Sequence, residues 1–474
     1  MKQRVTSAGR AILCALAGFA APAFALAQSP VQITKVLATP GEVALTWTSA
    51  GAGQAYSVQS RPSLAGGPWL TLSDPRPWPT PLTQWVDARA ERGSMAFYRV
   101  IAVPAAERGK VLSAGRVDTL TTDWIRLLLR AAGSTNIVPQ YAVEVHKIVY
   151  ETLDPLGART QASGVLAIPQ NPGKALPLAS YQHGTLVRAT EAPSVDQYAE
   201  RVIGIAFATT GYAAVVPDYL GLGDSPGLQP YHHARSEATA CVDLLRAART
   251  WCATNGVGLN GQLFLSGYSH GGHVTMALHR ELEAYHANEF TITASAPMAG
   301  AYDLSKTTLE DALSGRPMPN PYYFALLLAA YQDVYHFAGS LAEVLREPYN
   351  TTLPPLLTGT TSGSQINDAM TNVVTLVLEP EVVAALQENP NHPLLVALRE
   401  NDLYRWTPRA PMRLYHCKGD EDVVFANSEV ALASFHSLGA PQVELIETVP
   451  GGDHGACSRP SLEDAKAWFD TLRQ

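Results

Sequence analysis

Two periodicities of apolar residues divide this chain into two regions. In residues 30–103 apolar and polar positions alternate, as at Val43, Leu45 and Trp47, and Gly- and Pro-rich clusters separate the short apolar stretches. Alternation of period two is typical of half-buried strands, and short strands joined by turns are typical of two packed sheets. We therefore expect a small β-sandwich over residues 30–103.

Later in the chain, short and almost wholly apolar stretches alternate with helical patterns such as those of residues 122–132 and 235–251. Apolar strands with helices between them are typical of a mostly parallel sheet that is covered on both faces. This predicts an α/β domain over residues 116–474, joined to the β-sandwich by a linker at residues 102–115. Buried strands are expected at residues 178–182, 212–216, 262–266, 412–416 and 443–446.

The alternation of strands and helices stops between residues 300 and 410. Residues 321–337 are apolar almost all round, and further helical patterns recur at residues 341–345 and 382–386. A helix with apolar side chains on every side must be buried. We expect a helical insertion in the α/β domain here. Most of its aromatic side chains are expected to be ordinary core of this insertion.

A candidate nucleophile lies between an expected strand and an expected helix. The sequence Gly-Tyr-Ser-His-Gly occupies residues 267–271. A G-x-S-x-G motif between a strand and a helix is typical of a nucleophile elbow, which exposes its serine at the carboxyl edge of a sheet. Gly267 and Gly271 would let the backbone fold tightly. The pentapeptide alone is a weak signal, and its context makes Ser269 the predicted nucleophile.

A serine nucleophile needs a base that takes its proton and an acid that orients the base. After such an elbow the acid and the histidine follow the serine along the chain. Asp420 and Asp422 both lie in the loop after a buried strand, and we predict Asp422 because it comes three residues after Gly419 and precedes two valines. His454, in the loop after the next strand, is the predicted base. The alternative for the acids is a solvated loop.

The developing oxyanion needs hydrogen-bond donors. One is expected to be the backbone N–H of His270, the residue after the nucleophile. The second is expected in the loop after the strand at residues 178–182, where we predict the N–H of Thr185 first and that of Gly184 next. His183 in the same loop is expected to bond loop backbone rather than to take part in catalysis.

These motifs, with the stretches at residues 180–185, 217–225, 230–249 and 266–272, resemble the α/β-hydrolase superfamily, in particular secreted bacterial esterases and secretory lipases, over residues 115–474. The resemblance implies an α/β-hydrolase fold and a serine carboxylester hydrolase that acts through an acyl-enzyme and needs no cofactor. Small-molecule or lipid esters would be its substrates. The helical insertion at residues 300–410 resembles the cap or lid of related lipases, which would cover the serine and supply an apolar acyl pocket. One departure is Cys417, where many relatives have glycine. Residues 30–103 resemble a fibronectin type III-like module, with a spacer as its simplest role.

Composition agrees with an exported enzyme. Residues 1–27 contain three basic residues, an apolar run and a small-residue end, as in a signal peptide. Its removal would change the formal net charge from −8 to −11, which does not favour nucleic acid or an anionic membrane as partner. No later stretch is long and apolar enough to span a membrane. We expect a secreted or periplasmic protein.

Four of the five cysteines lie beyond residue 27. Cys241 and Cys252 are expected on one helix, roughly 16 Å apart, which is too far for a disulfide. Cys417 and Cys457 flank the acid and histidine loops, outside any expected long helix, and we predict that they pair. Two free thiols are the alternative. No metal-ligand spacing is present, so no metal is expected.

A serine peptidase and a non-catalytic binding protein are the two alternatives to ester hydrolysis. A serine peptidase of related fold would need a site for a charged or proline-bearing peptide, and the sequence offers no dedicated amine-binding acids. A non-catalytic binding protein that kept the fold would not need the intact set of Ser269, Asp422 and His454. Acyl chain length, alcohol group and oligomeric state do not follow from the sequence.

Overall fold

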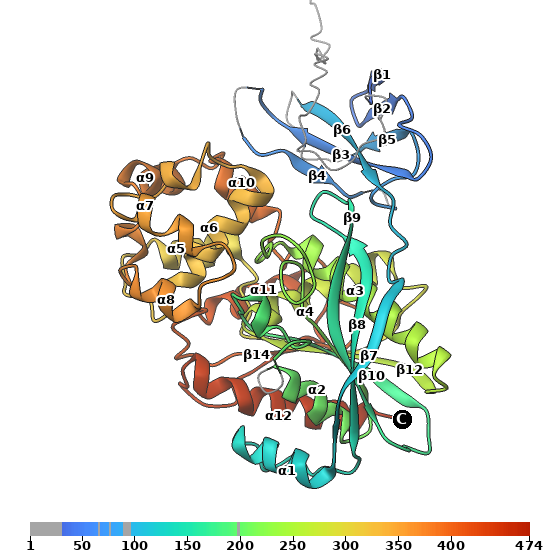
Figure 1. Cartoon of the computed structure of the whole chain (residues 1–474). Helices are drawn as coiled ribbons and strands as arrows, with labels where there is room; N and C mark the ends of the chain where they lie inside the picture. The colour runs from blue at the N-terminus through green and yellow to red at the C-terminus, as the bar shows by residue number, and fades with distance from the viewer. Residues whose placement is uncertain (1–30, 65–66, 75–76, 89–95, 197–199) are drawn as a thin grey trace, which may run out of the picture. The chain divides into compact units, whose positions relative to one another are not determined.

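The computed structural model describes residues 31–64, 67–74, 77–88, 96–196 and 200–474 (Figure 1). The predicted signal peptide lies outside these residues. The described chain forms two compact units: one contains the residues up to Ala106 together with Asp154–Arg159, and the other contains Glu107–Leu153 and Thr160–Gln474.

The first unit is a β-sandwich. Its described residues form two three-stranded antiparallel sheets, in the orders β1-β2-β5 and β4-β3-β6. Both sheets contribute to one core, since Leu45 and Trp47 of one sheet lie in the same buried cluster as Tyr56 and Val58 of the other. The expected sandwich is confirmed, and its likeness to a fibronectin type III-like module stays a prediction. The strands are β1 Ile33–Ala38, β2 Val43–Trp47, β3 Gln54–Arg61, β4 Leu70–Leu72, β5 Gln84–Asp87 and β6 Phe97–Pro104.

Within the described residues, the second unit contains a nine-stranded mixed sheet in the order β15-β14-β13-β12-β10-β11-β9-β8-β7. Strands β10 to β15 pair in parallel, whereas β7 pairs antiparallel with β8 and β9 pairs antiparallel with β11. The mostly parallel sheet is as predicted. The linker expected at residues 102–115 is shorter, because β6 extends to Pro104 and β7 begins at Val111. The strands are β7 Val111–Leu120, β8 Val143–Leu153, β9 Arg159–Pro169, β10 Leu176–Gln182, β11 Ala213–Pro217, β12 Leu259–Tyr268, β13 Ile292–Met298, β14 Arg413–Tyr415 and β15 Glu444–Ile446.

Helices cover both faces of this sheet, which explains why its strands are apolar throughout. In β11, Ala214 and Val216 belong to a buried cluster with side chains of α1, α2 and α12, while Ala213 and Val215 belong to a second cluster with side chains of α3 and α4. Successive side chains of a strand point to opposite faces, so a strand covered on both sides must be apolar at every position. These helices are α1 Thr122–Ala131, α2 Arg201–Ala208, α3 Ala234–Thr254, α4 His270–Tyr285 and α12 His454–Leu472.

The insertion between β13 and β14 is built of short helical segments, as expected for the cap. Its longest helix, α6 (Tyr322–Tyr335), has nine buried residues. The structure places the predicted helix at residues 382–386 within α9, and it places a 3-10 turn, Leu341–Glu343, in the region expected at residues 341–345. In the described part of the chain, no helix is long and apolar enough to cross a membrane. The remaining helices are α5 Leu309–Ala312, α7 Tyr349–Thr352, α8 Gly363–Asp368, α9 Pro380–Glu388, α10 Pro393–Arg399 and α11 Ala426–Ser437.

Candidate active site

Ser269 occupies a strained turn between β12 and α4. Its backbone has φ 60° and ψ −123°, a conformation that costs a non-glycine residue about 1–3 kcal/mol and persists only where the surroundings enforce it. Here the Ser269 N–H donates to the Met298 carbonyl of the neighbouring strand at 2.9 Å. Ser269 is half-buried while Tyr268 and His270 on either side are buried. The turn therefore presents the serine at the carboxyl end of the sheet.

The two glycines of the motif are required by close approach of the backbone. A Cβ at Gly271 would lie 1.9 Å from the Gln182 carbonyl oxygen, and a Cβ at Gly267 would lie 2.4 Å from the Gly271 carbonyl oxygen. Neither glycine has a positive φ. They allow the elbow to pack directly against the end of β10, where the predicted oxyanion loop begins.

The structure pairs His454 with Asp420, not with Asp422. His454 Nδ1 lies 2.6 Å from Asp420 Oδ2, and His416 Nε2 lies 3.1 Å from the same oxygen. Burial raises the pKa of Asp420, but the hydrogen bonds from His416 and His454 outweigh it and lower this pKa to about 2. The prediction of Asp422 as the partner of the histidine is therefore wrong.

Asp422 has a different partner. Both of its carboxylate oxygens accept from the Asn320 amide at 3.0 Å, and Asn320 in turn accepts from Asn367 of the cap. Burial raises the pKa of Asp422 above 3.8. The two aspartates lie two residues apart, so spacing from Gly419 could not separate their roles. Asp422 attaches the acid loop to the cap, and Asp420 faces the histidine.

His454 is the first residue of α12 and is tied to the elbow through Tyr268. The Tyr268 hydroxyl donates to the His454 carbonyl at 2.7 Å, and the two rings lie 5.0 Å apart. In the part of the chain that the structure describes, no hydrogen bond joins Ser269 Oγ to His454. Catalytic hydrogen bonds often tighten only when substrate binds. His454 thus lies next to the residue that precedes Ser269, on a helix rather than on the expected loop.

The predicted disulfide between Cys417 and Cys457 is present, with the two Cα atoms 6.1 Å apart. Cys457 lies in the first turn of α12, although no long helix was expected there. The acid and histidine loops also touch directly, because a Cβ at Gly419 would lie 2.3 Å from the Gly451 carbonyl oxygen. Cys241 and Cys252, the other cysteines in the described residues, are both buried and free on α3.

Removing this bridge should loosen the two loops that carry Asp420 and His454. The disulfide joins residues 40 apart, and a bridge of this length typically adds about 2–4 kcal/mol to the free energy of unfolding. We expect the double substitution Cys417→Ser and Cys457→Ser to lose stability in this range, and gentle reduction to lower activity before unfolding begins. Thiol titration of the denatured, unreduced protein should find two thiols beyond residue 27. Four thiols would contradict the bridge.

The predicted oxyanion loop follows β10, as expected. The Thr185 hydroxyl lies 2.7 Å from the Tyr231 hydroxyl, which fixes the side chain of Thr185. Gly184 faces the half-buried Glu200. Desolvation raises the pKa of Glu200, and hydrogen bonds from Tyr181 and the Gly184 backbone partly offset this rise. His183 Nδ1 lies 2.7 Å from the Gly184 carbonyl and Nε2 lies 3.2 Å from the Asp218 carbonyl. Burial lowers the pKa of His183 to about 4, so the ring is neutral and its single N–H donates to one of these two carbonyls. The structural role expected for His183 agrees with these contacts.

A buried acid behind the elbow was not anticipated. Glu237, in the first turn of α3, accepts from His270 Nε2 at 2.6 Å and from the His232 backbone N–H at 2.9 Å. Burial raises the pKa of Glu237 to about 7. The sequence signal that could have revealed Glu237 is its position as an acidic residue within an otherwise apolar face of α3. His273 lies 3.6 Å from the second Glu237 oxygen, yet among the described residues no group of three His, Cys, Asp or Glu is arranged to hold a metal ion.

The chain is similar to known lipases and esterases. Residues 190–471 match the family model of the secretory lipases. The rice cell wall degrading esterase LipA from Xanthomonas oryzae is similar, with 30% identity over 77% of this chain and 96% of its own, and a TM-score of 0.69. A protein from Legionella pneumophila named as a hydrolase has 26% identity over 77% of this chain and 98% of its own, with a TM-score of 0.71. Candida antarctica lipase A, at 18% identity, 77% and 83% coverage and a TM-score of 0.59, shares the fold. No curated protein matches this chain.

Proposed function

The chain belongs to the secretory lipase family and is a hydrolase of the lipase/esterase type, and on this premise we propose that it is a serine carboxylester hydrolase with Ser269 as nucleophile, His454 as base and Asp420 as acid. One observation carries the proposal: a serine in a strained elbow follows Tyr268, which contacts a histidine whose Nδ1 is 2.6 Å from a buried carboxylate. Small-molecule or lipid esters are the proposed substrates.

The reaction follows from these positions. Asp420 accepts a hydrogen bond from the protonated Nδ1 of His454, which leaves Nε2 as the basic nitrogen. Nε2 takes the hydroxyl proton of Ser269 while the Ser269 Oγ attacks the ester carbonyl. The protonated histidine then gives that proton to the leaving alcohol, and an acyl-enzyme forms. Water, activated by the same histidine, releases the acid and restores Ser269.

The backbone N–H groups of His270 and Thr185 are the proposed oxyanion donors. Neither N–H donates to a protein acceptor among the described residues, so both can donate a hydrogen bond to a substrate oxygen. Gly184 is a weaker candidate because its backbone faces the Glu200 carboxylate. The side chains of both proposed donors are anchored, by Glu237 and Tyr231. Donors that are oriented before the reaction stabilise charge most effectively.

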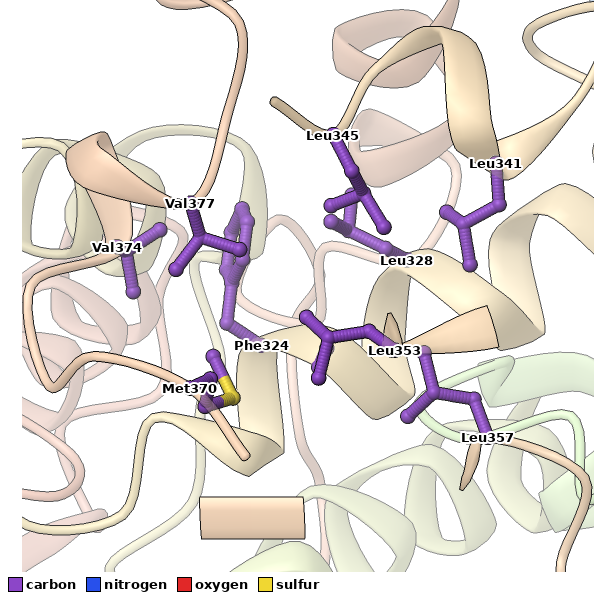
Figure 2. A pocket seen from close by; sticks show the side chains of 10 residues that line it. Phe324, Leu328, Leu341, Leu345, Leu353, Leu357, Met370, Val374 and Val377 are labelled. Carbon is purple, nitrogen blue, oxygen red and sulfur yellow. The ribbon is translucent and has the colours of Figure 1, made fainter. Parts of the chain in front are cut away.

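The cap contains a small apolar pocket within its buried core, and we propose that this pocket widens to take the acyl chain of the substrate (Figure 2). Its lining side chains come from α6 and from the short helices that pack on it, and none is polar. Asn320, which bonds Asp422 of the acid loop, lies two residues before α6, so α6 extends from the catalytic loops toward the pocket. The lining residues are Phe324, Ala325, Leu328, Leu341, Leu345, Leu353, Leu357, Met370, Val374 and Val377.

Two opposite changes on α6 test the proposal. Each buried methylene contributes about 0.8 kcal/mol, so loss of two of them lowers kcat/KM by roughly tenfold. Ala325→Leu should fill the pocket and reduce hydrolysis of long-chain p-nitrophenyl esters about tenfold relative to the acetate, whereas Phe324→Ala should enlarge it and shift preference toward longer chains. Wild-type protein that cleaves no ester but cleaves peptide anilides would favour a peptidase. An equal loss of all esters would contradict the acyl site.

We also propose that residues 1–27 direct export and are removed. The basic start, the apolar run and the small-residue end of this segment support the proposal, as does membership of a secretory family. A disulfide forms and persists in an oxidising compartment, which agrees with the Cys417–Cys457 bridge. Peptide mapping of the exported protein reports its first residue, which this proposal places at Gln28.

A further inference from the structure

A second imidazole contacts the carboxylate that orients His454. His416, the residue after β14, is fully buried, and its Nε2 lies 3.1 Å from Asp420 Oδ2, the oxygen that also faces His454 Nδ1. The other oxygen, Oδ1, accepts the backbone N–H groups of Asp422 at 3.0 Å and Val423 at 2.9 Å. One carboxylate thus faces four donors, and two of them are imidazole nitrogens.

The partners of His416 determine which ring nitrogen carries the proton. Nε2 faces two acceptors, Asp420 Oδ2 and the Val423 carbonyl at 2.8 Å, so Nε2 must be the donor. Nδ1 faces the Ser428 hydroxyl at 2.8 Å, a group on α11 that can donate or accept. The ring is therefore held from both ends, with its N–H directed at the acid loop.

We infer that His416 is a positioning residue for ester hydrolysis, which directs the Asp420 carboxylate to His454. The inference rests on the proposed function. Asp422 lies in the same loop but bonds Asn320 of the cap rather than an imidazole. The contact from His416 thus distinguishes the two aspartates. A purely structural role, in which His416 only bonds the Val423 carbonyl, is the competing explanation.

The two explanations differ in their effect on the pH profile. The titratable groups facing Asp420 are His416 after β14, His454 on α12, Tyr268 on β12 and Asp422 in the same loop. The His416 N–H lowers the proton affinity of Asp420 and weakens its attraction for a protonated His454. Loss of this N–H would favour the protonated, inactive base. The acid limb of kcat/KM should then move to higher pH.

Asparagine and glutamine at position 416 form a matched pair. Both are amides, but the amide of glutamine reaches the position of Nε2 and can donate to Asp420, whereas that of asparagine reaches only the position of Nδ1, beside Ser428. We expect His416→Asn to lower kcat tenfold or more, with little change in KM, and to move the acid limb upward by on the order of half a pH unit. His416→Gln should retain the wild-type acid limb and kcat within about threefold.

Ser428→Ala is the control, because it removes the hydrogen bond to the other ring nitrogen and leaves the contact with Asp420. It should lower the melting temperature without moving the acid limb. Identical acid limbs in all variants, with activity losses that follow the melting temperatures, would overturn the positioning role. If the asparagine variant does not fold, His416→Met, which has similar bulk and no donor, takes its place. Wild-type protein without esterase activity would instead refute the proposed function.

Discussion

Replacement of Ser269 by alanine should lower ester hydrolysis by about 10⁴- to 10⁶-fold, with the fold retained. The nucleophile, base and acid act as a unit, so loss of the attacking oxygen removes nearly all of their joint contribution. The melting temperature should not fall, because Ser269 Oγ bonds no described residue and the strained turn accepts a smaller side chain. Initial rates on a short-chain ester, with fluorophosphonate labelling, measure the effect.

Ser266→Ala is the matched control for this experiment. Ser266 lies three residues earlier on β12, is buried, and its Oγ has no hydrogen-bond partner in the described residues. It should keep wild-type rates and wild-type labelling, whereas Ser269→Ala should lose both. Wild-type activity in the Ser269 variant would refute the nucleophile. Labelling lost without loss of hydrolysis would point to a different active site.

Asp420→Asn and Asp422→Asn should differ by about three orders of magnitude in kcat. An asparagine at 420 can donate to His454 Nδ1, which favours the wrong tautomer of the base and costs on the order of 10⁴ in kcat. Asp422 bonds Asn320 at the cap and not the histidine, so Asp422→Asn should cost only a few-fold. The two substitutions are chemically identical and two residues apart, and each is a control for the other. The reverse ranking would return the acid to Asp422.

Asp420→Asn should also change the stability of the folded protein. The pKa of Asp420 is lowered from 3.8 to about 2 in the folded protein. A carboxyl with a depressed folded pKa stabilises the protein above its unfolded pKa, and this contribution is lost as the pH falls toward 2. Asp420→Asn should therefore lower the melting temperature at pH 7 and flatten its decline below pH 4. Kinetics of this variant must be measured well below its own melting temperature.

Much of the candidate site could be predicted from local sequence, because turns and strand burial depend on residues close together along the chain. The elbow depends on a turn that two glycines permit, and a Cβ at either position would meet backbone at 2.4 Å or less. The sheet depends on strands apolar at every position, as in β11. The bridge was predictable because Cys417 and Cys457 each lie within five residues of a loop that must approach the other. Each of these features could be predicted from short stretches of sequence around the residues concerned.

The identity of the acid was decided by tertiary contacts. Asp420 and Asp422 occupy the same loop and differ little in local sequence, yet His416 and His454 both contact Asp420, while Asn320, about a hundred residues away, binds Asp422. Hydrogen bonds between segments far apart in sequence leave no periodic signal. The same holds for Glu237 and its bond to His270. The sequence by itself determined where the proposed nucleophile, the proposed base and their two loops lie along the chain, because backbone turns and apolar periodicity are local. Only the tertiary structure decided which carboxylate of the acid loop contacts His454 and which contacts the cap, because that choice depends on donors supplied by other elements.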